Sequence, residues 1–333
     1  MKKHLFSKVL IIAVATTLLG ACNTRPKTSN TGNEETVPDF KISLAEWSLH
    51  RSYFGNSIND WAEFSKLLQE DPDSVLQGDM DPFDFPKVAA GYEIDCIELV
   101  NTFYYGKAKD MDYWQRFKQN CDDAGVTVGL IMCDALGNLG DSDPEARDAA
   151  VENHKPWVDV AAYLGAKTIR VNAAGEGTPE EVAAAAADGL RKLGEYAAGK
   201  GVNVVVENHG GYSSDAKWVV GVMEQVDMDN VGTLPDFGNF CIETDSTGAC
   251  IKEYDKYLGM EELMPYAKGV SAKSHEFDAD GNEVDSNFLQ LMTIVKDSGY
   301  RGYVGIEYEG TTLSEVDGIM ATKALLQKVF AEI

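Results

Sequence analysis

The chain has 333 residues, 44% of them apolar and 10% aromatic, with 29 Lys and Arg against 54 Asp and Glu. These proportions exclude collagen-like, fibrous and disordered chains. The formal net charge of −25 disfavours nucleic acid and anionic lipid surfaces as partners, because an acidic surface repels phosphate groups.

The first 21 residues have the pattern of an export signal. Lysines precede an apolar run, Val9–Leu19, which is shorter than the roughly 20 residues of a membrane-spanning helix. The sequence LGAC at 19–22 resembles the lipobox of bacterial lipoproteins, which implies that Cys22 is lipidated and begins the mature chain. An ordinary secretory signal that is cleaved and lost is the alternative. Residues 22–39 have few large apolar side chains and are expected to form a flexible tether.

The remaining cysteines do not indicate a disulfide framework. No CxxC pair occurs, and an odd number is left after Cys22. A Cys241–Cys250 bridge would be compatible with an oxidising compartment, whereas Cys96 and Cys133 lie in apolar runs and are expected to be packed thiols.

From residue 41 onward, eight β-rich runs alternate with amphipathic helical stretches. The sequence TPEE at 178–181 is a capping box with proline at the first helical position. Eight parallel strands close into a barrel, whereas open doubly wound sheets generally have five or six. We therefore predict a single (β/α)8 TIM barrel over residues 40–333. The expected strands are 42–48, 94–100, 126–132, 167–172, 202–208, 231–236, 269–275 and 302–308.

The last four runs each end in a potential metal ligand: Glu207, Asp236, His275 and Glu307. On this fold, chemistry lies at the carboxyl ends of the strands. An acidic residue at a strand end is more often solvated or salt-bridged. In VVVE and GIE, however, the glutamate belongs to a strand that is buried on both faces, where a carboxylate is costly unless a cation or hydrogen bonds stabilise it. Three carboxylates and one imidazole suit one divalent ion, Mn²⁺, Mg²⁺, Co²⁺ or Zn²⁺.

This set of four, with ENHGG and DFGN around two of them, resembles the xylose-isomerase-like superfamily of barrels, specifically its sugar (phosphate) isomerase/epimerase group, over about 40–333. The resemblance implies that Glu207 and Glu307 are both metal ligands and the acid/base pair, while Asp236 and His275 hold the ion. Several ketose epimerases of this group have a histidine three residues after the aspartate, where this chain has Asn239. This departure counts against the substrate pattern of those ketose epimerases and leaves the expected metal site intact.

Further polar residues near the strand ends are candidates for substrate binding. Lys273 shares the inward face with His275 and could neutralise an oxyanion or pair with a carboxylate. His209, two residues after Glu207, could bond a substrate hydroxyl or be structural. The other candidates, which could instead form salt bridges or pack, are Glu98, Arg170, Asn172 and Asn239, with Trp47 among several aromatic residues near the rim.

A divalent ion on a sugar carbonyl would stabilise the enediolate that forms when a carboxylate removes the neighbouring proton. Return of the proton epimerises or isomerises the sugar, and a leaving group β to the carbonyl would be expelled instead. Export and the lack of a glycine-rich phosphate cradle favour an unphosphorylated keto sugar, or a 3-keto-glycoside supplied by a partner oxidoreductase.

Two other functions fit the sequence less well. A non-catalytic sugar-binding lipoprotein would not need the complete set of four ligands. An apurinic-site-endonuclease-like phosphodiesterase would need a histidine-rich site and a basic surface, which this acidic chain with five histidines does not offer. We expect a lipid-anchored enzyme that faces the periplasm, contacts the membrane only through its lipid and binds no nucleic acid.

Overall fold

Eight parallel strands form the centre of the molecule. In the computed structural model, which describes residues 40–333, they pair in the order β6-β5-β4-β3-β2-β1-β10-β9. Parallel bridges join Thr233 to Ala267 and Asp236 to Ser271, and so close the sheet between its two ends. The predicted (β/α)8 barrel is confirmed. Its strands are β1 (Lys41–Ala45), β2 (Cys96–Val100), β3 (Thr127–Met132), β4 (Thr168–Val171), β5 (Asn203–Glu207), β6 (Val231–Leu234), β9 (Val270–Ser274) and β10 (Tyr303–Tyr308).

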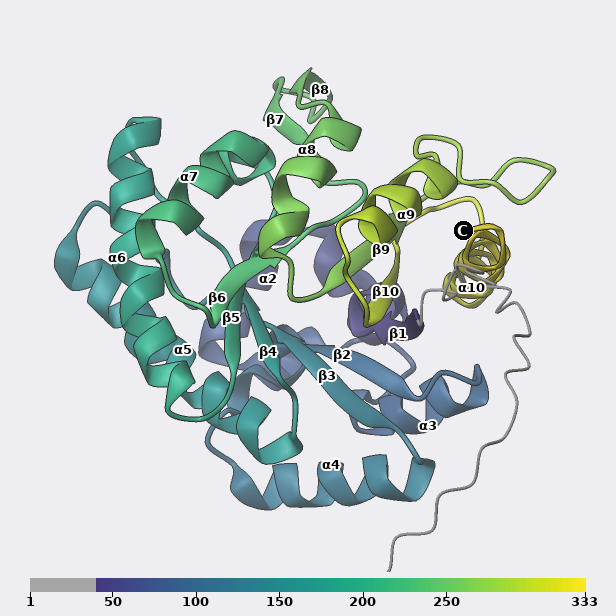
Figure 1. Ribbon diagram of the computed structural model, residues 1–333. Coiled ribbons are helices and arrows are strands. Elements are labelled where there is room, and N and C mark those ends of the chain that lie inside the picture. The colour runs from purple at the N-terminus through teal and green to yellow at the C-terminus, as the bar shows by residue number, and fades with distance from the viewer. Residues whose placement is uncertain (1–39) are drawn as a thin grey trace, which may run out of the picture. The chain divides into compact units, whose positions relative to one another are not determined.

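Helices surround the barrel (Figure 1). The predicted capping box begins α6: Thr178 and Glu181 bond reciprocally, with Pro179 in the first turn. Gly125, in a left-handed conformation, ends α4 before β3, as expected for a helix C-terminus. The helices are α1 (His50–Phe54), α2 (Trp61–Glu70), α3 (Phe85–Gly91), α4 (Met111–Ala124), α5 (Pro144–Leu164), α6 (Pro179–Ala198), α7 (Ala216–Val226), α8 (Lys256–Leu263), α9 (Phe288–Asp297) and α10 (Glu315–Glu332).

Several strands end earlier than the sequence predicts. β1 stops at Ala45, and Glu46–Leu49 forms the 3-10 helix η1. The buried carboxylate of Glu46 there accepts hydrogen bonds from the Val100 amide and the Tyr104 hydroxyl. β9 ends at Ser274, so His275 lies just beyond the strand.

A two-stranded hairpin, β7 (Cys241–Thr244) and β8 (Cys250–Glu253), stands apart from the barrel sheet (Figure 1). This hairpin was not predicted from the sequence. A disulfide joins Cys241 to Cys250, the pairing that the sequence left open, whereas Cys96 and Cys133 are buried thiols as expected. An isolated hairpin is marginally stable in water, so the covalent link helps to hold its two strands together.

The expected signal peptide (1–21), the lipidation site Cys22 and the tether (22–39) lie outside the described residues. Within residues 40–333, no helix has both the length and the apolar character needed to cross a membrane.

Candidate metal centre

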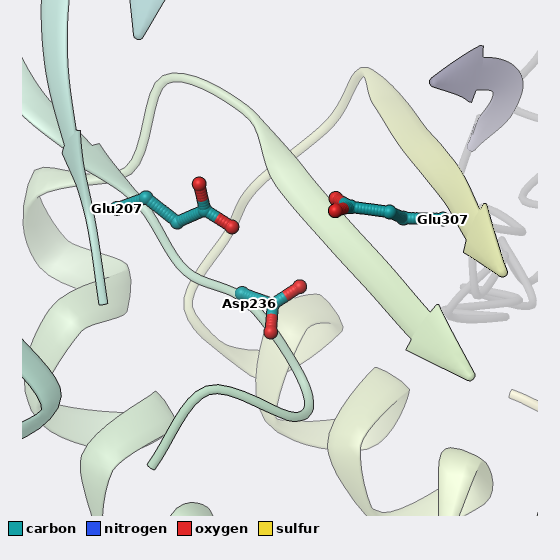
Figure 2. Close-up of side chains that lie close together, drawn as sticks. All are labelled: Glu207, Asp236 and Glu307. Carbon is teal, nitrogen blue, oxygen red and sulfur yellow. The ribbon is translucent and has the colours of Figure 1, made fainter. Parts of the chain in front are cut away.

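Three carboxylates converge inside the mouth of the barrel. Glu207 is the last residue of β5, Glu307 lies near the end of β10, and Asp236 follows β6. One oxygen from each lies within 4.8 Å of the others, and all three residues are buried. Figure 2 shows Glu207 and Glu307 directed toward each other, with Asp236 beside them on its loop.

The hydrogen bonds of this cluster leave specific oxygen atoms unpaired. Asp236 Oδ1 accepts the amides of Gly238 and Asn239, each at 2.9 Å, but Oδ2 has no donor among residues 40–333. Glu207 Oε2 lies 2.8 Å from Arg170 Nε, yet the N–H is not aligned with it, so both atoms lack a hydrogen-bond partner within the described chain. Buried carboxylate oxygens without partners are costly.

Burial raises the pKa of Glu207, Asp236 and Glu307, because a charged carboxylate is poorly solvated there. Lys273 opposes this rise at all three groups, and Arg170 opposes it at Glu207. Burial alone would lower the pKa of Lys273, but the surrounding carboxylates outweigh it and raise that pKa well above its usual value. Lys273 is therefore an ammonium ion at neutral pH.

The donor set fits a divalent cation. With Asp134 and Glu309, the centre contains five carboxylates. It contains two cationic side chains, Arg170 and Lys273. Full ionisation would leave an excess of three negative charges. Carboxylate oxygens are the ligands that hard divalent ions prefer. Asp236 Oδ2 accepts no hydrogen bond from the described residues, and Glu207 Oε2 has an ion-pair contact with Arg170 but no hydrogen bond.

His275, the fourth predicted ligand, is not part of this cluster, which contains the three carboxylates. Its inward-facing neighbours on β9 are there instead. Ser271 Oγ donates to Glu307 Oε2 at 3.0 Å, and Lys273 Nζ lies 3.4 Å from Glu307 Oε1. Residues 271, 273 and 275 share one face of the chain, but His275 follows the strand end and is only half-buried.

Three of the candidate substrate-binding residues, Arg170, Asn172 and Asn239, lie beside the centre. Arg170 Nη1 and Asn172 Nδ2 donate to Asp134 Oδ1 at 2.6 and 2.7 Å. Asn239 accepts from Lys273 Nζ and donates to Glu207 Oε1, both at 3.3 Å. Asn239 therefore links Lys273 to Glu207.

His209 projects into the mouth of the barrel, where its side chain is exposed. Partial desolvation in the barrel mouth, followed by the charges of Arg170 and Lys273, lowers its pKa. The imidazole is therefore neutral at pH 7 and can both donate and accept a hydrogen bond.

Glu98 does not lie at the mouth. β2 continues two residues beyond it to Val100, so Glu98 occupies a deeper layer of the barrel, where it accepts a 2.6 Å hydrogen bond from Ser43. Burial, with a contribution from Glu207, raises its pKa to about 7. The expectation that Glu98 ends its strand is therefore corrected.

Three residues of the centre were not predicted from the sequence: Ser271, Asp134 and Glu309. Glu309 lies two residues after Glu307 and therefore faces the same side of the chain. The alternation of side chains along a strand is enough to predict this. Glu309 accepts from Lys273 Nζ at 3.2 Å. Asp134 follows the end of β3, where the strand-end rule would also have found it.

A cavity of about 380 Å³ opens over the centre. Arg170, Lys273 and Glu307 are on its polar side, while Trp47, Trp61 and Phe64 are among its apolar lining residues. Glu207 lies behind Arg170 and Asn239, which contact its two oxygens. The cavity thus combines an aromatic wall with charged groups.

Comparisons with known proteins agree with this architecture. A 3-keto-D-glucoside 4-epimerase from E. coli is 15% identical, with a TM-score of 0.58, covering 87% of this chain and 99% of its own. A xylose isomerase-like TIM barrel protein from Mycobacterium smegmatis in complex with magnesium is 16% identical (TM-score 0.59; 89% and 97% covered). A sugar phosphate isomerase/epimerase from Parabacteroides distasonis is 17% identical (TM-score 0.58; 91% and 98% covered).

These likenesses show the fold. No curated protein is similar enough in sequence to count as a match. The family model described as xylose isomerase-like TIM barrel matches residues 86–329, which is more than half of the chain. The protein therefore belongs to the xylose isomerase-like TIM barrel family.

Proposed function

We propose that the protein is a metal-dependent enzyme that removes the proton next to the carbonyl of an unphosphorylated keto sugar. The observation that carries this proposal is the geometry of Glu307. Its carboxylate lines the sugar-sized cavity, faces Glu207 (Figure 2), and lies 3.4 Å from the ammonium of Lys273. A base and a cation are thus held side by side where a carbonyl and its neighbouring C–H would bind.

Glu207, Asp236 and Glu307 would hold the divalent ion, Mn²⁺, Mg²⁺, Co²⁺ or Zn²⁺. When bound, the ion would supply positive charge for the enediolate oxygens. Burial raises the pKa of Glu307, which strengthens it as a base toward a weakly acidic C–H. The Lys273 ammonium is placed to stabilise the same oxyanion.

The other residues of the cavity would orient the ring. Arg170, Asn172, Asn239 and His209 offer hydrogen bonds to hydroxyl groups, and Trp47 offers an aromatic face. Glu207, whose two oxygens contact Asn239 and Arg170, would be the second member of the acid/base pair. His275 stays a predicted ligand, since its half-buried side chain follows directly after β9.

Two outcomes follow from the same proton abstraction. Return of the proton to the sugar gives an epimer or an isomer. In a 3-keto-glycoside, removal of the C2 proton forms the C1=C2 bond while the C1–O bond breaks, and the aglycone oxygen takes up a proton. This elimination makes the protein a lyase and needs no oxidant, although a partner oxidoreductase must first make the ketone.

We also propose that the protein is exported and lipid-anchored through Cys22, facing the periplasm. The Cys241–Cys250 disulfide supports an oxidising compartment. The names of the solved neighbours, which include a 3-keto-glucoside epimerase, support the substrate class.

The test is proton exchange in D₂O. Metal-loaded protein is incubated with free ketoses and, separately, with a 3-keto-glucoside, and the products are analysed by NMR and mass spectrometry. Deuterium uptake without cleavage supports the isomerase or epimerase, and aglycone release supports the lyase. Glu207→Gln and Glu307→Gln should each abolish turnover, while Glu332→Gln, at an exposed position on α10, should not. Neither exchange nor release, with no stoichiometric metal, would favour a sugar-binding protein instead.

A further inference from the structure

A second and larger cavity, of about 600 Å³, opens beside the first. The two cavities share Ala135 and His209 as lining residues. The second cavity is formed by the segments 133–138, 172–175 and 209–213, which follow β3, β4 and β5, and by the β7–β8 hairpin. It therefore lies at the same carboxyl-terminal mouth of the barrel as the metal centre.

The lining of this second cavity suits an uncharged polar group. Its carboxylate is Glu243 and its ammonium is Lys252, which are register partners across the hairpin, so these two charges balance. Two imidazoles, His154 and His209, also line it. Asn138 and Tyr212 add neutral hydrogen-bonding groups, and Ile242 adds an apolar contact. An anion such as phosphate would require several converging cations, whereas this mixture fits a hydroxylated or aromatic ring.

The hairpin that closes one side of this cavity is not required by the barrel. Its strands are largely exposed, and they pair only with each other in the described part of the chain. The disulfide, together with a hydrogen bond from the Tyr254 amide to the Phe240 carbonyl, fixes its base. A rigid accessory hairpin that contributes Ile242, Glu243 and Lys252 to a cavity is consistent with a binding role.

We infer that the second cavity is the subsite for the group attached to the keto sugar, an aglycone or a second sugar ring of a glycoside. This inference rests on the proposed function for placing the keto ring over the metal centre. The first cavity has the size for one sugar ring, and small-ligand pockets of about 300–1,000 Å³ enclose most of their ligand. A free monosaccharide would leave the second cavity unused, whereas a glycoside spans both.

His209 lies at the junction between the two cavities. A glycoside that fills both must pass this side chain, so the imidazole is placed to bond the linking oxygen or a hydroxyl beside it. The substrate class is therefore a keto glycoside with an uncharged attached group, and this favours the lyase outcome or glycoside epimerisation over free-ketose isomerisation.

A filling variant tests the subsite. Ala174 lines the second cavity, and its side chain is exposed, so Ala174→Trp should fill the space without disturbing the core. The matched control is Ala331→Trp, at an exposed position on α10. The probes are 4-nitrophenyl β-D-glucoside, which has no carbonyl and cannot react, and D-glucose, and their binding to metal-loaded protein is measured by calorimetry.

The wild type should bind the nitrophenyl glucoside at least tenfold more tightly than D-glucose. Ala174→Trp should remove that advantage and leave D-glucose binding and the melting temperature unchanged, while Ala331→Trp should behave as wild type. Lys252→Ala provides a second, smaller change that should weaken glucoside binding about threefold. Equal affinity of the wild type for both probes, or an equal loss of both in Ala174→Trp, would overturn the subsite.

This binding assay separates the inference from the proposed function. Absence of turnover on every keto sugar would refute the catalytic proposal, yet the affinity difference between the nitrophenyl glucoside and D-glucose would still be measured. In an active enzyme, Ala174→Trp should also lower kcat/KM for 4-nitrophenyl 3-keto-β-D-glucoside at least tenfold and leave that for free 3-keto-glucose within twofold. An equal effect on both substrates would likewise overturn the subsite.

Discussion

Replacing Lys273 by methionine tests whether its ammonium compensates the buried carboxylates. Lys273 is 3% exposed, and Nζ lies 3.4 Å from Glu307 Oε1 and 3.2 Å from Glu309 Oε1. Methionine keeps most of the side-chain volume but removes the charge. Removing one partner of a buried ion pair typically costs about 3–5 kcal/mol, because the other charge remains uncompensated.

The pKa of Glu309 also indicates how much the charge of Lys273 stabilises the buried carboxylates. Burial would raise it, but Lys273 and nearby groups outweigh burial and lower the pKa from 4.5 to about 2. That depression is equivalent to about 3 kcal/mol of stability. Since the folded-state pKa is lowered, this stability is present above about pH 4.5 and is lost as the pH falls toward 2. It is therefore fully present at pH 7.

Urea unfolding of metal-free protein at pH 7 measures the effect. Lys273→Met should lower the free energy of unfolding by about 3–5 kcal/mol and the melting temperature by about 6–10 °C. The control is Lys328→Met, the same change at an exposed position, which should stay within about 0.5 kcal/mol of wild type. A Lys273→Met variant as stable as Lys328→Met would refute the reasoning.

Three further predictions concern the cavities and the fold. Trp47→Ala should raise KM for the keto sugar about tenfold in steady-state assays, because it removes an aromatic face from the first cavity; an unchanged KM would contradict that role. Replacing Cys241 and Cys250 together by serine should weaken nitrophenyl glucoside binding in calorimetry while the urea midpoint of the barrel changes little, since the hairpin strands are largely exposed; unaltered binding would speak against a rigid hairpin. Burial lowers the pKa of His154, so this residue favours the folded state fully above about pH 6.5, and that contribution is lost as the pH falls. His154→Asn should therefore lose less stability than the wild type between pH 7 and pH 5. Equal losses of unfolding free energy in urea titrations at these two pH values would contradict the prediction.

Strand alternation and strand ends were enough to predict the barrel and its three carboxylates. Glu207, Asp236 and Glu307 each follow or end a short apolar run, and the fold brings such positions to one mouth. His275 was the residue predicted from this side of the strand, but Ser271 and Lys273 face the same side and contact Glu307. Their height along the barrel axis depends on the shear of the sheet, which alternation does not reveal.

Height along the barrel axis also explains the wrong placement of Glu98. Its side chain points into the barrel as expected, but it lies one layer below the mouth. The β7–β8 hairpin could not be predicted, because its exposed strands have no alternating pattern of apolar residues. The second cavity depends on three loops and this hairpin meeting in space, and loop conformations of that kind are not encoded in periodicity.

Anomalous diffraction at the manganese edge, from crystals grown with MnCl₂, tests the metal centre most directly. We predict one anomalous peak within bonding distance of Glu207, Asp236 and Glu307, about 2.0–2.4 Å from their oxygens, and its loss in Asp236→Asn crystals. A map without a peak among these carboxylates, while Lys273 remains paired with Glu307, would contradict the account.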